Sequence, residues 1–161
     1  MTALQALDAS PTPRAACDRT LPALLLRSRE PVVVESYFAG WEKPWRALSS
    51  AAWRELFLAL DGGLHALLVE TGANREFAER HGLEVIPTVL VFLRGELVAR
   101  FTGRVSPQQV AAAVRGALAQ LHQRDAEEAE LALLADASES SSPVRSILRR
   151  RSSTPALAHA G

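Results

Sequence analysis

The side chains of this sequence that could do chemistry are few and scattered. Cys17 is the only cysteine, so the chain has no pair of thiols and cannot form an internal disulfide. A reactive thiol needs a basic neighbour and a helix N-terminus, and only Arg14 and Arg19 lie near Cys17 in the sequence. We therefore interpret Cys17 as an incidental small residue.

The sequence lacks the residue patterns that a metal site or a nucleophilic active site requires. The four histidines have no second ligand at metal spacing, so we expect no metal site and assign no cofactor; they are His65, His81, His122 and His159. The sequence contains no nucleophile-elbow serine and no phosphate loop.

One short segment, residues 41–45 with the sequence Trp-Glu-Lys-Pro-Trp, precedes a helical pattern. Glu42 at a helix start is stabilised by the helix dipole, typically by about 0.3–1 kcal/mol. Trp45 has two interpretations. It either continues the buried stripe of the following helix, or forms with Trp41 an exposed apolar surface beside Pro87, as interface tryptophans do.

Composition narrows the class of protein. The 161 residues suit one domain with tails, and a hydrophobic fraction of 48% allows a sizeable core. A formal net charge of zero gives no reason to expect nucleic-acid or membrane-surface binding. The start of the chain does not resemble a secretory signal, and no apolar run approaches the roughly 20 residues that span a bilayer. We expect a cytoplasmic protein.

The periodicity predicts alternating helices and strands. The expected elements are a helix over residues 21–28, a buried strand over 31–38, a helix from Trp45 to Leu60, a strand over 64–69, a helix over 74–81, a hairpin over 89–101 and a helix from Pro107. This order predicts an α/β sandwich with a mixed central sheet and helices on both faces, in which the first two main strands form a right-handed parallel crossover.

The stretch from Gly82 to Gly103 carries a family resemblance. Its Ile86-Pro87-Thr88 corner directly precedes an apolar strand and a short turn at residues 94–96. Together with the strand and helix before it, this corner resembles the cis-proline corner of the thioredoxin superfamily. The resemblance covers about residues 20–122 and implies a thioredoxin-like three-layer sandwich with a cis Ile86–Pro87 bond.

The resemblance also implies a loss of redox chemistry. Thioredoxins carry Trp-Cys-Gly-Pro-Cys after the first main strand, where one thiolate attacks a disulfide and a second thiol resolves the intermediate. Here Trp41 and Pro44 match that motif, while Glu42 and Trp45 replace both cysteines. Ser36 stands where the family usually has a buried acid. We therefore expect no catalytic residue and no enzyme activity.

The resemblance implies a groove that holds extended polypeptide, and the chain keeps Trp41, Pro44, Ile86, Pro87 and Gly103 of that groove. The expected groove residues are Trp41, Glu42, Pro44, Trp45, Ile86, Pro87 and Gly103. We predict a redox-inactive polypeptide-binding or assembly and chaperone-type module, whose partner is a protein or an extended peptide. The alternatives are a thiol oxidoreductase acting through Cys17, and a structural or regulatory subunit that binds through its C-terminal tail.

The flanking segments are expected to lie outside the domain. Residues 1–19 are predicted as a flexible N-terminal arm, residues 20–122 as the thioredoxin-like domain, and residues 123–135 as an acidic helical extension. Residues 136–161 are rich in Ser and Arg and are predicted to be disordered. We interpret the basic run at residues 149–153 as solubilising.

Overall fold

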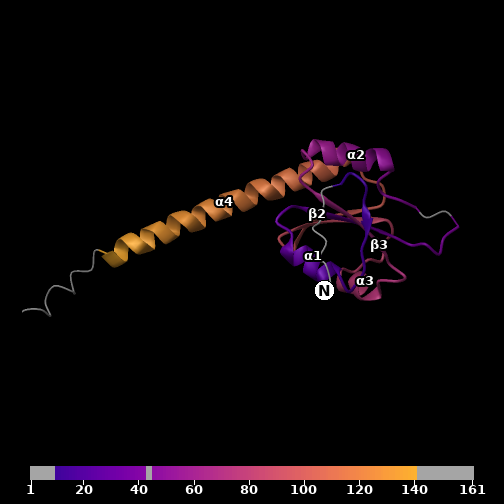
Figure 1. Ribbon diagram of the computed structural model, residues 1–161, viewed down its shortest axis with the longest axis horizontal. Helices are drawn as coiled ribbons and strands as arrows, with labels where there is room; N and C mark the ends of the chain where they lie inside the picture. The colour runs from indigo at the N-terminus through magenta and orange to yellow at the C-terminus, as the bar shows by residue number, and fades with distance from the viewer. Residues whose placement is uncertain (1–9, 43–44, 141–161) are drawn as a thin grey trace, which may run out of the picture. The chain divides into compact units, whose positions relative to one another are not determined.

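The computed structural model describes residues 10–42 and 45–140. The elements are β1 (Arg14–Ala15), α1 (Leu21–Arg27), β2 (Val32–Tyr37), α2 (Ser50–Ala59), β3 (His65–Glu70), α3 (Arg75–Arg80), β4 (Thr88–Leu93), β5 (Glu96–Thr102) and α4 (Pro107–Ser140) (Figure 1). The strands form one five-stranded sheet in the order β1-β3-β2-β4-β5.

The sheet is mixed, as the sequence predicts. Strand β2 lies at its centre, parallel to β3 and antiparallel to β4, and β5 completes a hairpin at one edge. The β4–β5 turn places Arg94 and Gly95 at φ 51° and 82°, which is the left-handed geometry of a two-residue hairpin loop. The turn expected at residues 94–96 is present as a loop of Arg94 and Gly95, and Glu96 is the first residue of β5.

Helices cover both faces of the sheet, which confirms the predicted sandwich. Figure 1 shows α2 on one side of the sheet and α1 and α3 on the other. On the α2 side, the core includes Trp53 and Leu56 together with Val110 and Val114 of α4. On the other side, the core is formed by the following residues: Leu21, Leu25, Val32, Val34, Leu67, Val69, Phe77, Leu90 and Phe92. A near-continuous apolar β2 is what a strand covered on both faces requires.

The N-terminal segment differs from the loose arm predicted over residues 1–19. Residues 14–15 form β1, which pairs with β3 at the sheet edge. Asp18 caps α3: its carboxylate accepts the N–H groups of Glu76 and Phe77 at 3.3 and 2.9 Å, and its own N–H donates to Asn74 at 2.9 Å. A two-residue strand and a cap supplied from 58 positions away leave no periodic signal in the sequence. Residues 1–9 lie outside the described residues.

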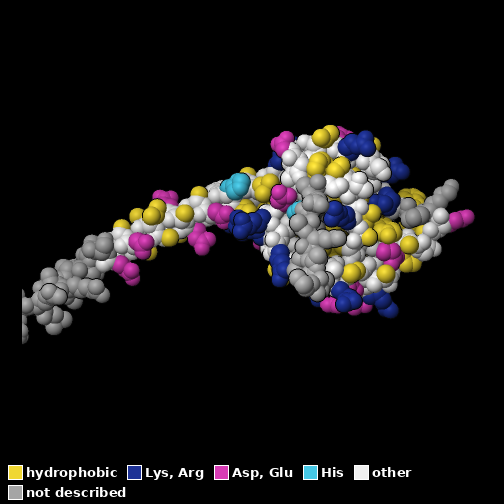
Figure 2. Space-filling view, viewed as in Figure 1, with side chains coloured by type: hydrophobic (Ala, Val, Ile, Leu, Met, Phe, Trp, Pro, Cys, Tyr) yellow, Lys and Arg dark blue, Asp and Glu magenta, His cyan; other side chains and the backbone are white. Residues whose placement is uncertain are grey.

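The chain divides into two compact units, residues 1–120 and 121–161. Within the second unit α4 continues to Ser140, so helix covers both the predicted extension at 123–135 and the first residues of the predicted disordered tail. Residues 122–139 are exposed, and Figure 2 shows hydrophobic and acidic side chains on the surface of this segment. Residues 141–161 lie outside the described residues. Among the described helices, none is both long and apolar enough to cross a bilayer.

Candidate functional site

A buried carboxylate organises the loop that follows β2. Glu35 is fully buried, and its two oxygens accept a bidentate pair of hydrogen bonds from Arg46 at 2.8 and 2.9 Å. The same carboxylate accepts the N–H of Ala47 at 2.7 Å, that of Leu48 at 3.5 Å, and the indole N–H of Trp53 at 3.0 Å. Charge-assisted bonds of this kind are the strong ones, so Glu35 fixes the path of the chain between β2 and α2.

This arrangement corrects the start of the second helix. The sequence predicts a helix from Trp45, whereas α2 begins at Ser50 with Ser49 as its N-cap, whose hydroxyl accepts the N–H of Ala52 at 3.2 Å. Because Glu35 binds the backbone N–H groups at 47 and 48, that segment is held outside the helix. Serine is a preferred N-cap, so the local signal was present but was outweighed by the apolar spacing.

The exposure of Trp45 decides between its two interpretations: the ring is on the surface and does not continue the buried stripe of the helix. Trp45 is 65% exposed and Trp41 is 44% exposed, with its ring edge-on to Phe38 at 5.7 Å between centroids. The tryptophan that fills the core is Trp53, at 1% exposure.

The buried acid also differs from expectation. By the family resemblance, Ser36 occupies the position where thioredoxins usually have a buried acid, so no buried acid was expected there. The structure has a buried carboxylate one residue earlier, at Glu35. Ser36 instead exchanges hydrogen bonds with the backbone of Thr88, accepting its N–H and donating to its C=O, both at 3.0 Å. A carboxylate inside the apolar run of β2 was the signal that could have identified Glu35, because a buried charge needs partners.

The proline corner lies at the same end of the sheet as the loop that follows β2. The Ile86–Pro87 peptide is cis, and Ser36 pairs with Thr88, which places the corner beside the end of β2. Gly103, at φ 76°, donates its N–H to the carbonyl of Pro87 at 2.7 Å. Pro87 is buried and Ile86 partly buried. The structure therefore brings Ile86, Pro87 and Gly103 together.

Ile86 keeps its backbone hydrogen-bonding groups available. Within residues 10–42 and 45–140, neither its N–H nor its C=O has a hydrogen-bond partner. Strand addition uses such unpaired main-chain groups.

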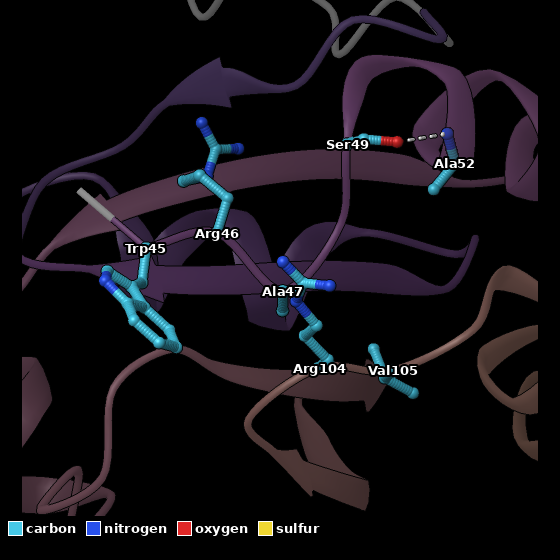
Figure 3. Close-up of a pocket in the computed structure, with 7 residues that line it drawn as sticks. All are labelled: Trp45, Arg46, Ala47, Ser49, Ala52, Arg104 and Val105. Carbon is cyan, nitrogen blue, oxygen red and sulfur yellow. Dashed lines mark hydrogen bonds between the residues drawn. The ribbon is translucent and has the colours of Figure 1, made fainter. Parts of the chain in front are cut away.

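A pocket of about 560 Å³ opens between the loop after β2 and the connection after β5 (Figure 3). Its lining residues are Trp45, Arg46, Ala47, Ser49, Ala52, Arg104 and Val105. In Figure 3, Arg104 extends from the connection after β5 toward the segment that carries Ala47. Of these residues, sequence reasoning named only Trp45 as a site residue. Glu42 is exposed and does not line the pocket, and Pro44 lies outside the described residues.

Curated relatives identify the family. The chain is 32% identical over 81 residues to a thioredoxin of Griffithsia pacifica, a match that covers 50% of this chain and 72% of the relative. It is 30% identical over 88 residues to thioredoxin 1 of a Nostoc species, covering 55% of this chain and 80% of the relative. The chain belongs to the thioredoxin family.

Solved structures agree on the thioredoxin fold. A mutant thioredoxin from Halobacterium salinarum superposes with a TM-score of 0.51 at 15% identity, covering 66% of this chain and 90% of that one. A chain from work on thiol resolution in yeast mitochondrial 1-Cys peroxiredoxin gives a TM-score of 0.52 at 12% identity, covering 65% and 95%. No family model matches the sequence.

The only thiol of this thioredoxin-family chain lies away from the proline corner. Cys17 follows β1, and β3 separates β1 from β2, so adjacent-strand spacing places about 10 Å between β1 and β2. Cys17 is exposed, and a hydrogen bond with the Thr20 side chain lowers the pKa of its thiol. Among the described residues, no group of three His, Cys, Asp or Glu side chains could hold a metal ion.

Proposed function

We propose that this thioredoxin-family chain is a polypeptide-binding module of the assembly or chaperone type that does not exchange disulfides. The observation that carries the proposal is the exposure of Trp41 and Trp45 on the loop between β2 and α2, at 44% and 65%. Tryptophans of this kind serve as interface anchors, because a rigid ring buries a large area with little loss of entropy. We refer to Trp41, Trp45, Ile86, Pro87 and Gly103 as the candidate groove.

The backbone of the corner supports the same proposal. The N–H and C=O groups of Ile86 are unpaired within the described part of the chain, so an extended peptide can add to them as a strand. The bond between Gly103 and Pro87 holds the two loops of the groove together before a partner binds. Preorganisation of this kind reduces the entropy lost on binding.

The distribution of thiols argues against disulfide exchange. The family resemblance aligns Glu42 and Trp45 with the two cysteines of thioredoxin, and neither side chain can form a mixed disulfide. Cys17 has no second cysteine to resolve such an intermediate. The lowered pKa of Cys17 is the one feature that favours the alternative of a thiol reaction at that residue.

Selection from a displayed library of short random peptides tests the proposal. The purified full chain should enrich extended peptides, and Trp41→Ala should weaken their binding by about 2 kcal/mol, or roughly thirtyfold, as for a hot-spot residue. Leu58→Ala is the matched control, because Leu58 is an exposed apolar residue on α2 outside the groove. Enrichment that Trp41→Ala and Trp45→Ala both leave unchanged would contradict the groove assignment.

Two further measurements address the alternatives. Turnover of insulin disulfides by the wild-type chain, lost in Cys17→Ser, would replace the binding proposal with a thiol reaction. If removal of residues 141–161 releases the selected peptides while Trp41→Ala retains them, the tail is the binding element.

A further inference from the structure

Among the described residues, those that line the pocket carry a positive charge that no acidic lining residue offsets. The pocket contains two arginines, and none of the described residues that line it is acidic. The charge of Arg46 is offset by Glu35, which holds it through a bidentate ion pair. Arg104 is exposed and has no hydrogen bond or ion pair with any described residue. Among the described residues that line the pocket, the charge without a partner is therefore that of Arg104.

Apolar surface surrounds this charge. The Trp45 ring and the Ala47, Ala52 and Val105 side chains line the same pocket (Figure 3). An aliphatic side chain that ends in a carboxylate matches such a surface, because its methylene groups contact the apolar walls while its charge pairs with the guanidinium.

The pocket shares one residue with the candidate groove. Arg104 directly follows Gly103, whose N–H is bonded to Pro87, and Trp45 belongs to both the pocket and the groove. A peptide that packs on the Trp45 ring therefore lies at the pocket that Arg104 also lines.

From these observations we propose that the polypeptide bound in the candidate groove is acidic, with an Asp or Glu at a fixed position, and that Arg104 selects it. The inference rests on the proposed function and adds the chemistry of its partner. Arg104 acts as a specificity residue, and Arg46 has a different task because its guanidinium is committed to Glu35.

Charge reversal at Arg104 tests the inference. Wild-type, Arg104→Glu and Arg29→Glu chains are each selected against the same displayed library of short random peptides. Arg29 is an exposed arginine on the connection between α1 and β2, so its reversal changes net charge equally and leaves the pocket unaltered. We expect wild type and Arg29→Glu to enrich Asp or Glu at one position, and Arg104→Glu to lose that preference or to replace it with Lys or Arg.

One selected peptide is then measured beside its amide counterpart, with Gln for Glu or Asn for Asp. Fluorescence anisotropy should show Arg104→Ala weakening the acidic peptide about two- to fivefold, the range of an exposed ion pair, with little change for the amide peptide. Thermal melts of all variants should coincide, because Arg104 is exposed.

The outcomes separate the two proposals. Peptides enriched by wild type without acidic preference, and equally by Arg104→Glu, would overturn the inference and leave the binding function standing. An acidic preference that survives Arg104→Glu would assign the selection to another residue and would also overturn the inference. If none of the three chains enriches any peptide, both proposals are overturned.

Discussion

Trp53 and Trp45 lie eight positions apart and have opposite surroundings. Trp53 is 1% exposed and donates its indole N–H to the buried Glu35, whereas Trp45 is 65% exposed and lines an open pocket. We call Glu35, Arg46 and Trp53 the Glu35 cluster. Glu35 and Trp53 of the cluster are buried, whereas Trp41 and Trp45 of the candidate groove are exposed.

This difference indicates that the buried tryptophan contributes to stability and that the exposed one is available for binding. A buried ring with its N–H satisfied contributes to the core, where truncation leaves a cavity. An exposed ring adds little to folding and is available for a partner. Variants in the Glu35 cluster should therefore change the free energy of unfolding, and variants in the groove should change peptide affinity.

The largest effect should come from removing the buried carboxylate. Glu35→Ala leaves the partly exposed Arg46 guanidinium and the buried N–H groups of Ala47 and Trp53 without their acceptor. Each unsatisfied buried donor costs about 1–3 kcal/mol, so we expect a loss of about 3–5 kcal/mol in total. Urea unfolding measures this loss. The exposed Glu42→Ala should change stability by less than about 0.5 kcal/mol, and equal losses for both variants would contradict a special role for Glu35.

The two tryptophans provide a direct comparison. Trp53→Ala should destabilise the domain by about 3–5 kcal/mol, because the cavity forms in the α2 side of the core. Trp45→Ala should stay within about 0.5 kcal/mol of wild type. Thermal melts of the two purified variants decide this, and a core-like loss for Trp45→Ala would remove the distinction between cluster and groove.

Asp18, which caps α3, belongs to neither the Glu35 cluster nor the candidate groove. Its variants should therefore change stability and leave peptide affinity unchanged. Asp18→Ala removes the acceptor for the first N–H groups of α3, so we expect a loss of about 1 kcal/mol, typical of a helix cap. Asp18→Asn keeps an acceptor oxygen and should lose less. Peptide affinity, measured well below the unfolding temperature, should be unchanged in both variants.

The smallest effect concerns pH. Burial lowers the pKa of His65 in the folded chain, with the charge of Glu30 opposing that shift. In the unfolded chain His65 has a pKa of about 6.5, so it binds a proton more readily there than in the folded chain. The stability that neutral His65 contributes is therefore present above that pH and is lost as the pH falls through the folded pKa.

Burial also lowers the pKa of His81, which packs on Phe77 and Phe92, so this residue acts in the same direction. Urea unfolding should show lower stability at pH 5 than at pH 7.5. The difference should shrink in His65→Gln and persist in His122→Gln, where the histidine is exposed. An unchanged difference in His65→Gln would show that its burial does not matter.

The fold was accessible to sequence reasoning because its signals are local. The apolar run of β2, the Arg94–Gly95 turn and the proline before β4 each act through near neighbours in the chain. The start of α2 was misplaced because the deciding contact is between Glu35 and the N–H groups 12 and 13 positions later. Helical spacing of apolar residues carries no information about such a contact.

The amino-acid sequence by itself determined the class of fold, the expected corner at Ile86–Pro87 and the presence of a single thiol. Only the tertiary structure decided which tryptophan is buried, which residue carries the buried acid, and that Arg104 lines a pocket whose other described residues include no acidic side chain. The physical reason is that burial and charge pairing depend on contacts between segments distant in the chain. Sequence periodicity reports only which face of a single element is apolar.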